Sequence, residues 1–414
     1  MSVNLEKSWL HSPTSLQALD EKAQAFTRVA YSQSSLNRSV YCILGIPIDA
    51  IDLAAVASQV EAAAAKRALL LISTPNLNFL VNSLSDSEFR ESLLNSDLCP
   101  PDGMPIIWIA RILGLPIRER ASGADLLERL QTNGKNTRQL ALFLFGGAEG
   151  VAASAARNLN SRPGGLHCVG SMNPGFGDVA EMSQDHIIDA VNSSGADFLV
   201  VSLGAKKGQL WLQRNHRRLK IPVRSHLGAA INFQAGTVKR APLFLRIWGF
   251  EWLWRVKEER YLWTRYRGDG LVFARLLLTR VLPLVLLSKW QHLRWKQRAS
   301  ELLFRVADHD QSIEVCLAGA ALESHVPAAI LRFQEMLARN RDVVVSLSET
   351  TQIDARFMGL LLMLRKELGS RGRELRLSAV PRAIERLLRL NELGFLLDPI
   401  NRHRDVAVAS YESS

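Results

Sequence analysis

The feature that most constrains the fold is a regular alternation of short apolar segments with amphipathic ones between residues 40 and 240. Each apolar segment has the length of a strand and stops abruptly at Gly, Pro, Asn or Ser. The expected strands are Tyr41–Ile46, Ala68–Ile72, a run just before Pro100, Thr137–Phe145, Leu166–Gly170, Asp197–Leu203 and Pro222–His226. The expected helices between them include Leu53–Lys66, Phe79–Leu94, Ile106–Ile112 and Asp185–Ser193. This alternation is typical of parallel sheets buried on both faces, so the sequence predicts a doubly wound, Rossmann-like α/β domain.

One expected strand-to-helix turn, Pro100-Pro101-Asp102-Gly103, carries a carboxylate with two alternative uses. In open α/β sheets, such turns lie where ligands bind, outside the carboxyl ends of the strands. Asp102 precedes a predicted helix, so its side chain can cap that helix. It can also accept a proton from a substrate. The turn alone favours capping, but the surrounding sequence shifts the balance towards catalysis.

Several fixed spacings surround this turn. They are Thr74-Pro75-Asn76, Asp97-Leu98-Cys99-Pro100-Pro101-Asp102-Gly103, Trp108, Arg111, Gly114, Pro116, Glu119-Arg120, Gly123, Asp125-Leu126, Gly228 to Pro242 and Gly249 to Arg255. This pattern resembles the WecG/TagA/CpsF glycosyltransferases (glycosyltransferase family 26) over about residues 42 to 267. The resemblance implies an inverting, metal-independent transfer from a UDP-sugar, often of the N-acetylmannosamine type. The implied acceptor is a polyprenyl-diphosphate-linked saccharide in cell-surface or exopolysaccharide biosynthesis.

The resemblance also implies roles for individual residues. Asp102 would take the proton from the attacking acceptor hydroxyl. Thr74 and Asn76 would hold sugar or acceptor hydroxyls. Gly146 and Gly147 would cradle the donor diphosphate at a helix N-terminus, although this turn alone is equally consistent with tight packing. The other predicted substrate-binding residues are Gly103, Arg120, Asp125, Gly204, Lys207, Gly228, Arg255, Arg260 and Arg265. No metal ion and no cofactor besides the donor substrate is expected.

One block departs from the family pattern, which usually reads G-x-P-K-Q-E-x-W after the strand 197–203. This chain has Lys206, Gly208 and Gln209 at the Pro, Gln and Glu positions. The departure motivates an alternative function, a non-catalytic regulator that senses a sugar nucleotide and acts through the C-terminal part of the chain. A weaker alternative is a dinucleotide-dependent oxidoreductase, for which the GxGxxG spacing is absent.

The formal net charge of +11 is concentrated in Val238–Arg298, which holds 14 Lys or Arg and 4 Asp or Glu. Within it, Leu271–Lys289 is apolar but interrupted by Arg275 and Arg280, and Pro283 is expected to kink it. Apolar residues with cationic flanks and interfacial Trp favour a helix lying in a membrane surface over a bundle helix or a spanning helix. We therefore expect an anionic membrane surface as a partner, and a cytoplasmic protein peripheral on the inner face of the cytoplasmic membrane. No recognised nucleic-acid-binding module occurs, so no nucleic acid partner is expected.

The C-terminal part resembles a STAS domain, the anti-sigma-factor-antagonist fold. Strands are expected at Ser312–Leu317, Asp342–Leu347 and Glu374–Ala379, and Asp354 precedes a helix. Regulatory members carry a phosphorylatable Ser or Thr after this Asp, and here the position is Ala355. A phosphorylation switch is therefore not expected, whereas docking of a protein partner is. The Asp308-His309-Asp310 sequence matches a DxD motif, but its position in the linker argues against a metal-nucleotide site.

Four units are expected along the chain. They are a poorly ordered arm (1–38), a glycosyltransferase-like domain (39–240), a basic, membrane-associating helical appendage (241–300) and a STAS-like domain (301–414). The four cysteines are widely separated and form no CxxC pair, which fits a reducing compartment. A homo-oligomer is compatible with the sequence, which does not identify the donor sugar or the acceptor.

Overall fold

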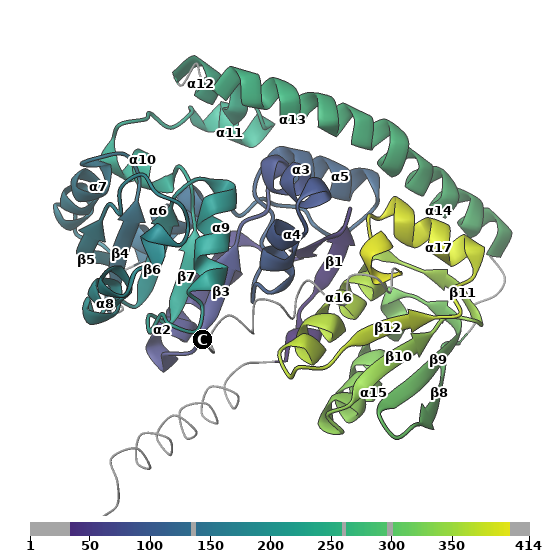
Figure 1. Cartoon of the computed structure of the whole chain (residues 1–414). Helices are drawn as coiled ribbons and strands as arrows, with labels where there is room; N and C mark the ends of the chain where they lie inside the picture. Colours follow the sequence, from purple (N-terminus) through teal and green to yellow (C-terminus); the bar gives the residue numbers. More distant parts are fainter. Residues whose placement is uncertain (1–33, 134–137, 259–261, 296–300, 398–414) are drawn as a thin grey trace, which may run out of the picture.

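The computed structural model describes residues 34–133, 138–258, 262–295 and 301–397 (Figure 1). Its N-terminal domain is built on a five-stranded sheet in the order β3-β7-β6-β4-β5, in which every neighbouring pair is parallel. The strands are β3 (Leu70–Ser73), β4 (Leu140–Gly146), β5 (Leu166–Met172), β6 (Phe198–Ser202) and β7 (Val223–His226). Their carboxyl ends therefore meet at one edge of the sheet, as parallel strands require.

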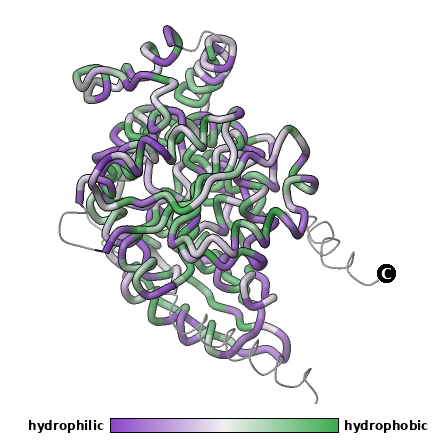
Figure 2. The backbone as a smooth tube through the Cα atoms, turned by 90° about the vertical axis from the view of Figure 1, so that its left-hand side faces the viewer, coloured by the Kyte–Doolittle hydropathy of each residue, from purple (hydrophilic) through white to green (hydrophobic). Residues whose placement is uncertain are grey.

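Helices cover both faces of this sheet. Leu142 and Leu144 of β4 belong to one hydrophobic core, and Phe143 and Phe145 belong to another on the opposite face. The first face is covered by α2 (Leu53–Lys66), α6 (Gly123–Asn133), α7 (Val151–Asn160) and α10 (Ala230–Ala235). The second is covered by α8 (Asp185–Ser193), α9 (Ala205–Arg214) and the short η2 (Glu181–Ser183). Figure 2 shows the most hydrophobic stretches of backbone in the middle of the molecule. The predicted doubly wound α/β fold is confirmed.

Three predicted elements differ in detail. The helix expected over Phe79–Leu94 is two helices, α3 (Leu77–Ser85) and α4 (Ser87–Leu94), because Asp86 ends the first and caps the second. The run before Pro100 forms only an isolated bridge between Ile72 and Leu98. The strand expected over Tyr41–Ile46 is instead an antiparallel hairpin of β1 (Val40–Ile43) and β2 (Ile46–Asp49).

A third core joins this hairpin to the C-terminal domain. It includes residues of α3, α4 and α5 (Met104–Ile112) together with most of the apolar C-terminal side chains. Leu36 lies fully buried in it, within the short η1 turn (Ser35–Asn37). The folded domain therefore begins before residue 39, where the sequence placed its boundary, and the rest of the predicted N-terminal arm lies outside the described residues.

The C-terminal domain is a smaller α/β unit. Its sheet has the parallel order β11-β9-β10-β12, with β8 antiparallel to β9. The strands are β8 (Leu303–Asp308), β9 (Ser312–Ala321), β10 (Asp342–Ser346), β11 (Thr350–Ile353) and β12 (Leu375–Ser378). The helices are η4 (Glu323–His325), α15 (Val326–Ala338), α16 (Ala355–Gly369), α17 (Arg382–Leu390) and η5 (Gly394–Leu396). Asp354 caps α16 by accepting a hydrogen bond from Phe357 N (2.8 Å), as predicted.

A helical appendage connects the two domains and runs along both of them (Figure 1). It comprises α11 (Leu243–Trp248), α12 (Glu251–Glu258), α13 (Leu262–Leu276), a π-helical turn η3 (Leu277–Val281) and α14 (Leu282–Trp295). The disturbance expected at Pro283 is this widened turn just before it, since proline cannot donate an amide hydrogen. The 28-residue stretch Leu262–Lys289 is long and apolar enough to cross a membrane, because it contains an 18-residue window with a mean hydropathy of 2.0.

Contacts at two points along the long helix formed by α13, η3 and α14 hold it against the rest of the protein. Asp269 accepts a hydrogen bond from the Asn78 side chain (3.3 Å) near one end, and Arg280 pairs with Glu392 (2.6 Å) further along. Leu276, Val281 and Leu284 on the same helix face are buried in the core shared with the C-terminal domain. One face of the helix is therefore occupied by protein.

Candidate active site

Asp102 lies at the carboxyl edge of the parallel sheet, beside the end of β3. The extended segment that leads to it follows the edge strand, because Ser73 N donates to Leu98 O (2.9 Å) and Asp102 N donates to Pro75 O (2.8 Å). Pro101 O in turn accepts a hydrogen bond from Ala121 N (2.8 Å), which brings the start of α6 to the same turn. The backbone thus holds Asp102 where ligands of such sheets bind.

The Asp102 carboxylate does not cap the following helix. The N-cap of α5 is Gly103, at φ 91°, and it makes no side-chain capping bond. Within the described parts of the chain, no group hydrogen-bonds to the Asp102 side chain. The capping interpretation is therefore wrong, and the carboxylate stays available to a ligand.

The pKa of Asp102 is raised to about 7, mainly because the half-buried carboxylate is desolvated. The Arg120 charge opposes this shift, those of Glu251 and Asp125 add to it, and Arg255 opposes it again. A carboxylate with a pKa near neutrality is suited to general-base catalysis, because it accepts a proton readily and is still ionised in about half of the molecules at pH 7.

The appendage supplies two of these neighbours. Glu251 and Arg255 are four residues apart on α12, so they project from one helix face towards the Asp102 turn. Arg120 donates to Glu251 Oε2 (2.6 Å) and lies 3.5 Å from Asp125 Oδ2. Predicted site residues from three separate parts of the sequence therefore meet at Asp102. Sequence reasoning did not select Glu251, although it stands in the family-like block that ends at Arg255.

Arg120 and Asp125 are committed to ion pairs within the protein. Asp125 accepts hydrogen bonds from Ser122 Oγ (2.5 Å) and Arg240 Nη2 (2.5 Å). Although burial acts in the opposite direction, these bonds and the nearby arginines lower the pKa of Asp125. The two residues predicted to bind substrate thus fasten the appendage to the turn that carries Asp102.

Thr74, Asn76 and Gly103 lie together beside Asp102. Thr74 is buried, and Asn76 caps α3 by accepting a hydrogen bond from Phe79 N (3.1 Å). A side chain at Gly103 would lie 3.7 Å from Asn76 Cβ. Asn76 Oδ1 accepts the capping hydrogen bond, so the amide nitrogen Nδ2 of Asn76 is the atom that remains for a ligand.

The predicted glycines lie at the carboxyl ends of three neighbouring strands. Gly146 allows β4 to approach β6 closely, since a Cβ there would be 2.5 Å from Ser202 O. Gly147 N donates to the same Ser202 O (2.8 Å), which explains these two residues by packing. Gly204 begins α9 without a side-chain cap, and Gly228 O accepts a hydrogen bond from Ser202 Oγ (2.5 Å).

The block that departs from the family pattern has structural partners. Lys206 pairs with Asp86 (2.6 Å), and Lys207, predicted to bind substrate, donates to Gly177 O (2.7 Å). Gln209 is buried and donates to Ser73 Oγ (2.8 Å). These contacts hold α9 against the loops around it, and Lys207 Nζ is bonded to backbone.

His226 is a buried residue at this edge that sequence reasoning did not select. Neither of its ring nitrogens has a hydrogen-bond partner in the described structure, and burial lowers its pKa to about 4. The His226 ring packs directly against Gly208 and leaves no room for a side chain there: a Cβ at Gly208 would be 2.1 Å from His226 Cδ2. The small residue at position 208 and the large one at position 226 therefore fit each other.

Of the remaining predicted arginines, Arg265 is not among the charges that act on Asp102. Arg265 lies on the exposed side of α13, 5.3 Å from the centre of the Tyr266 ring. Arg260 lies outside the described residues. Among the described residues of the tail, Arg255 is the predicted arginine whose charge acts on Asp102.

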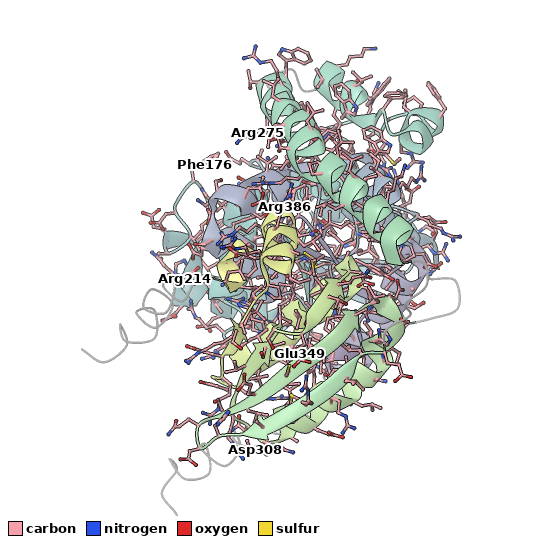
Figure 3. The ribbon with its side chains drawn as sticks, turned by 90° about the vertical axis from the view of Figure 1, so that its right-hand side faces the viewer. Phe176, Arg214, Arg275, Asp308, Glu349 and Arg386 are labelled. Carbon is pink, nitrogen blue, oxygen red and sulfur yellow. The ribbon has the colours of Figure 1, made fainter. Side chains whose placement is uncertain are left out.

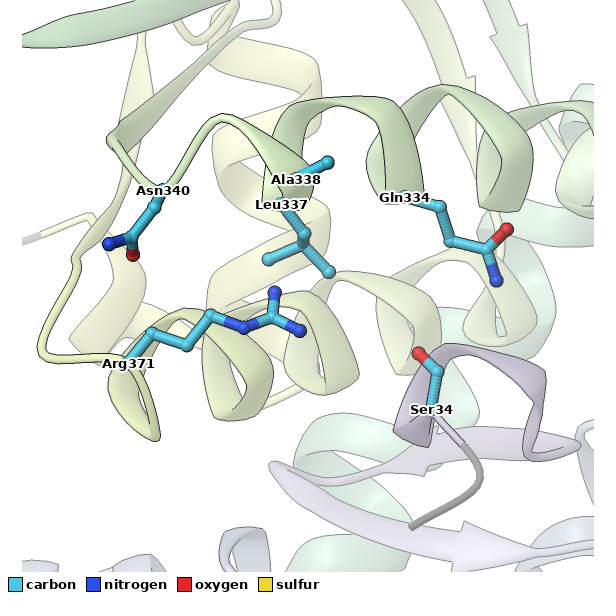
Figure 4. A pocket seen from close by; sticks show the side chains of 6 residues that line it. All are labelled: Ser34, Gln334, Leu337, Ala338, Asn340 and Arg371. Atoms are coloured by element: carbon cyan, nitrogen blue, oxygen red, sulfur yellow. The ribbon is translucent and has the colours of Figure 1, made fainter. Parts of the chain in front are cut away.

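Three further observations concern residues away from this site. Among the described residues, no group of three or more His, Cys, Asp or Glu side chains could hold a metal ion. Asp308 of the DxD-like sequence pairs with Arg339 (2.6 Å) and Arg341 (3.6 Å). A hollow of about 530 Å³ on the C-terminal domain contains no predicted site residue (Figure 4). It is lined by Ser34, Gln334, Leu337, Ala338, Asn340 and Arg371.

Comparison with known proteins identifies the class to which this site belongs. The sequence model described as "Glycosyl transferase WecG/TagA/CpsF family" matches residues 41–302, which is more than half of the chain. The protein belongs to this family and is a glycosyltransferase. A second sequence model, described as "Mlab, STAS domain", matches residues 304–398. Both predicted family resemblances are confirmed.

Two relatives share the first domain. Both are named N-acetylglucosaminyldiphosphoundecaprenol N-acetyl-beta-D-mannosaminyltransferase, one from Bacillus spizizenii and one from Bacillus subtilis. The first is 23% identical over 200 residues, which is 48% of this chain and 75% of the relative. The second is 21% identical over 195 residues, 47% of this chain and 74% of the relative. A solved structure described as "The overall structure of SLC26A9" covers 74% of this chain and 59% of its own, at 9% identity and a TM-score of 0.18, too low for any argument.

The start of α16, where STAS regulators carry their phosphorylated residue, is covered by the N-terminal domain. Arg356 donates to Val40 O (3.2 Å) and Arg38 O (3.1 Å). Gly359 packs so closely on β1 that a Cβ would be 2.2 Å from Val40 O. A protein partner of the STAS domain would therefore have to bind another of its faces.

Proposed function

We propose that the enzyme transfers a sugar from a UDP-sugar to a polyprenyl-diphosphate-linked saccharide, with inversion and without a metal ion. The names of both relatives describe a transfer to a lipid-diphosphate-linked N-acetylglucosamine, which supports this acceptor class and an N-acetylmannosamine-type donor. The observation that carries the proposal is the Asp102 carboxylate. It lies at the ligand-binding edge of the sheet, has no hydrogen-bond partner within the described residues, and has its pKa raised to about 7.

In the proposed reaction, Asp102 accepts the proton of the acceptor hydroxyl as its oxygen attacks the anomeric carbon. The new glycosidic bond forms as the bond to UDP breaks, so a single displacement inverts the anomeric centre. Thr74 and the Asn76 amide lie beside Asp102 and would hold substrate hydroxyls. Arg255 would stabilise the charge of the departing diphosphate, since a guanidinium stays charged and donates several hydrogen bonds.

We further propose that the enzyme is cytoplasmic and works on the inner face of the cytoplasmic membrane. The acceptor class has a lipid tail, and the appendage that delivers Glu251 and Arg255 to Asp102 continues into the long helix α13–α14. Leu271, Leu278 and Leu286 on that helix are 68%, 67% and 59% exposed. Because its opposite face packs on protein, this helix would lie in the membrane surface rather than cross the membrane.

The test is sugar transfer by the full chain in detergent. The acceptor is a short polyprenyl-diphosphate-GlcNAc, the donors are a panel of UDP-sugars, and Asp102→Asn is the matched variant. We expect UDP release that requires the acceptor and falls about 100-fold or more in Asp102→Asn, the usual contribution of a general base. Undiminished turnover of Asp102→Asn would remove Asp102 from the mechanism. UDP binding without transfer to any acceptor would favour the sensing regulator.

A further inference from the structure

A hollow lined by arginines lies between the long helix and the C-terminal domain. Its volume is about 290 Å³. The residues that line it are Arg280, Arg382, Glu385, Arg386, Arg389 and Leu390. Arg280 comes from the π-helical turn of the appendage and the others come from α17, so the hollow exists only because the two elements pack together.

The positive charge of this hollow is only partly neutralised. Arg280 pairs with Glu392 (2.6 Å), and Arg389 pairs with Glu385 (2.9 Å). Arg382 and Arg386 are exposed, and among the described residues no carboxylate lies within ion-pair distance of either. Like charges four residues apart weaken a helix, so an anion between Arg382 and Arg386 would relieve a repulsion that the protein itself leaves in place.

An exposed row of leucines runs along the helix that borders the hollow. Leu271, Leu278, Leu282 and Leu286 are between 48% and 68% exposed, and their spacing puts them on one helix face. Arg275 is exposed within the same row. Figure 3 shows Arg275 on the long helix and Arg386 on α17 at the same side of the molecule.

We propose that this hollow binds the phosphate of an anionic phospholipid headgroup, so that the STAS domain forms part of the membrane-binding surface. Arginine matches phosphate oxygens with pairs of hydrogen bonds, and its stem packs along apolar surface while its head stays at the headgroup level. The exposed leucines lie on the other side of the same helix from Arg280, where they would contact the acyl chains of a membrane that the helix lies on, which favours a lipid headgroup over a soluble phosphate. This inference rests on the proposed membrane-peripheral location of the enzyme.

The test is partitioning of the full-length protein onto vesicles, with Arg382→Gln/Arg386→Gln as the variant. The control is Arg162→Gln/Arg332→Gln, which removes the same charge from exposed arginines outside the hollow. The vesicles are pure phosphatidylcholine, or phosphatidylcholine with phosphatidylglycerol. On the anionic vesicles we expect the hollow variant to bind about 10- to 30-fold more weakly than the parent, and the control to change by less than about threefold. On neutral vesicles all three should bind equally weakly, because the choline cation of each headgroup balances the charge of its phosphate and leaves no net attraction for the arginines.

Other outcomes would overturn the inference. If the hollow variant binds anionic vesicles as tightly as the parent, or if the control loses as much binding, the arginines of the hollow are not a lipid site. If millimolar inorganic phosphate displaces the protein from anionic vesicles, the hollow binds a soluble anion rather than a lipid headgroup. Both variants are also assayed for transfer in detergent, where the hollow has no role. Loss of transfer by every form, with the vesicle result intact, would therefore count against the proposed reaction alone.

Discussion

The acid limb of the pH–activity profile can be traced to particular charges around Asp102. With a pKa of about 7, only about 1% of Asp102 is ionised at pH 5, so kcat/KM should fall about 100-fold there from its value at high pH. Glu251→Gln is the informative change, because Glu251 raises this pKa and also occupies Arg120 at 2.6 Å. Removing the carboxylate deletes a repulsion and frees Arg120 to act on Asp102.

Both consequences of Glu251→Gln lower the pKa of Asp102. Loss of one close negative charge moves a carboxylate pKa by about one unit. The acid limb should therefore shift to lower pH by about one unit, and activity at pH 5 relative to the plateau should rise about tenfold. The plateau itself should fall modestly, because a weaker base accepts the proton less readily.

The assay measures UDP release under kcat/KM conditions between about pH 5 and pH 9. Glu128→Gln is the control, since it removes an equal charge that pairs with Arg240 and is not among the residues that act on Asp102. An unmoved acid limb in Glu251→Gln, or a shift to higher pH, would refute the reasoning. If the residual activity of Asp102→Asn shows an acid limb at the same pH as the parent, the titrating group is not Asp102.

The remaining predictions concern packing and stability. Gly208→Ala should destabilise the fold by about 1–2 kcal/mol, although alanine has the better helix propensity, because the new Cβ would be 2.1 Å from His226 Cδ2. Thermal unfolding should show that this destabilisation disappears when His226→Ala is already present. Gly359→Ala should cost about 1–3 kcal/mol, because its Cβ would be 2.2 Å from Val40 O, and an unfolding transition of unchanged midpoint would contradict the docking of α16 on β1. Asp102→Asn should become more stable relative to the parent as the pH rises. The pKa of Asp102 is higher in the folded than in the unfolded state, so the parent loses the stability that protonated Asp102 provides as the pH rises towards about 7. An equal difference in melting temperature between variant and parent at pH 5 and at pH 8 would contradict this prediction.

The C-terminal domain is joined to the structural base of the active site. Lys366 on α16 donates to Asp97 Oδ1 (2.7 Å), and Asp97 Oδ2 accepts a hydrogen bond from Leu71 N (2.9 Å) in β3. Asp97 begins the extended segment that ends at Asp102. The STAS domain therefore supports the segment that positions the predicted base. This role does not need a phosphorylatable residue at position 355, where the chain has alanine.

The α/β architecture and the family can both be predicted from the sequence alone. Apolar strand-length runs that end at turn residues leave few alternatives to a doubly wound parallel sheet, and the spacing around Asp102 is specific to one family. The same local patterns could not separate α3 from α4, because Asp86 serves both as the end of one helix and as the cap of the next. Nor could they distinguish capping from catalysis at Asp102, since both uses favour the same residue type in the same turn.

Which charged side chains lie next to one another depends on the three-dimensional packing of the chain. Arg120, Asp125 and Arg255 were predicted to bind substrate, but the effect of each depends on neighbours distant in sequence, and Glu251 gained its role only when α12 was placed against the Asp102 turn. The pKa of Asp102 likewise follows mainly from burial, which a sequence does not specify residue by residue. Electrostatic interactions act through space over several ångströms, so the working state of a carboxylate is fixed by the folded arrangement around it.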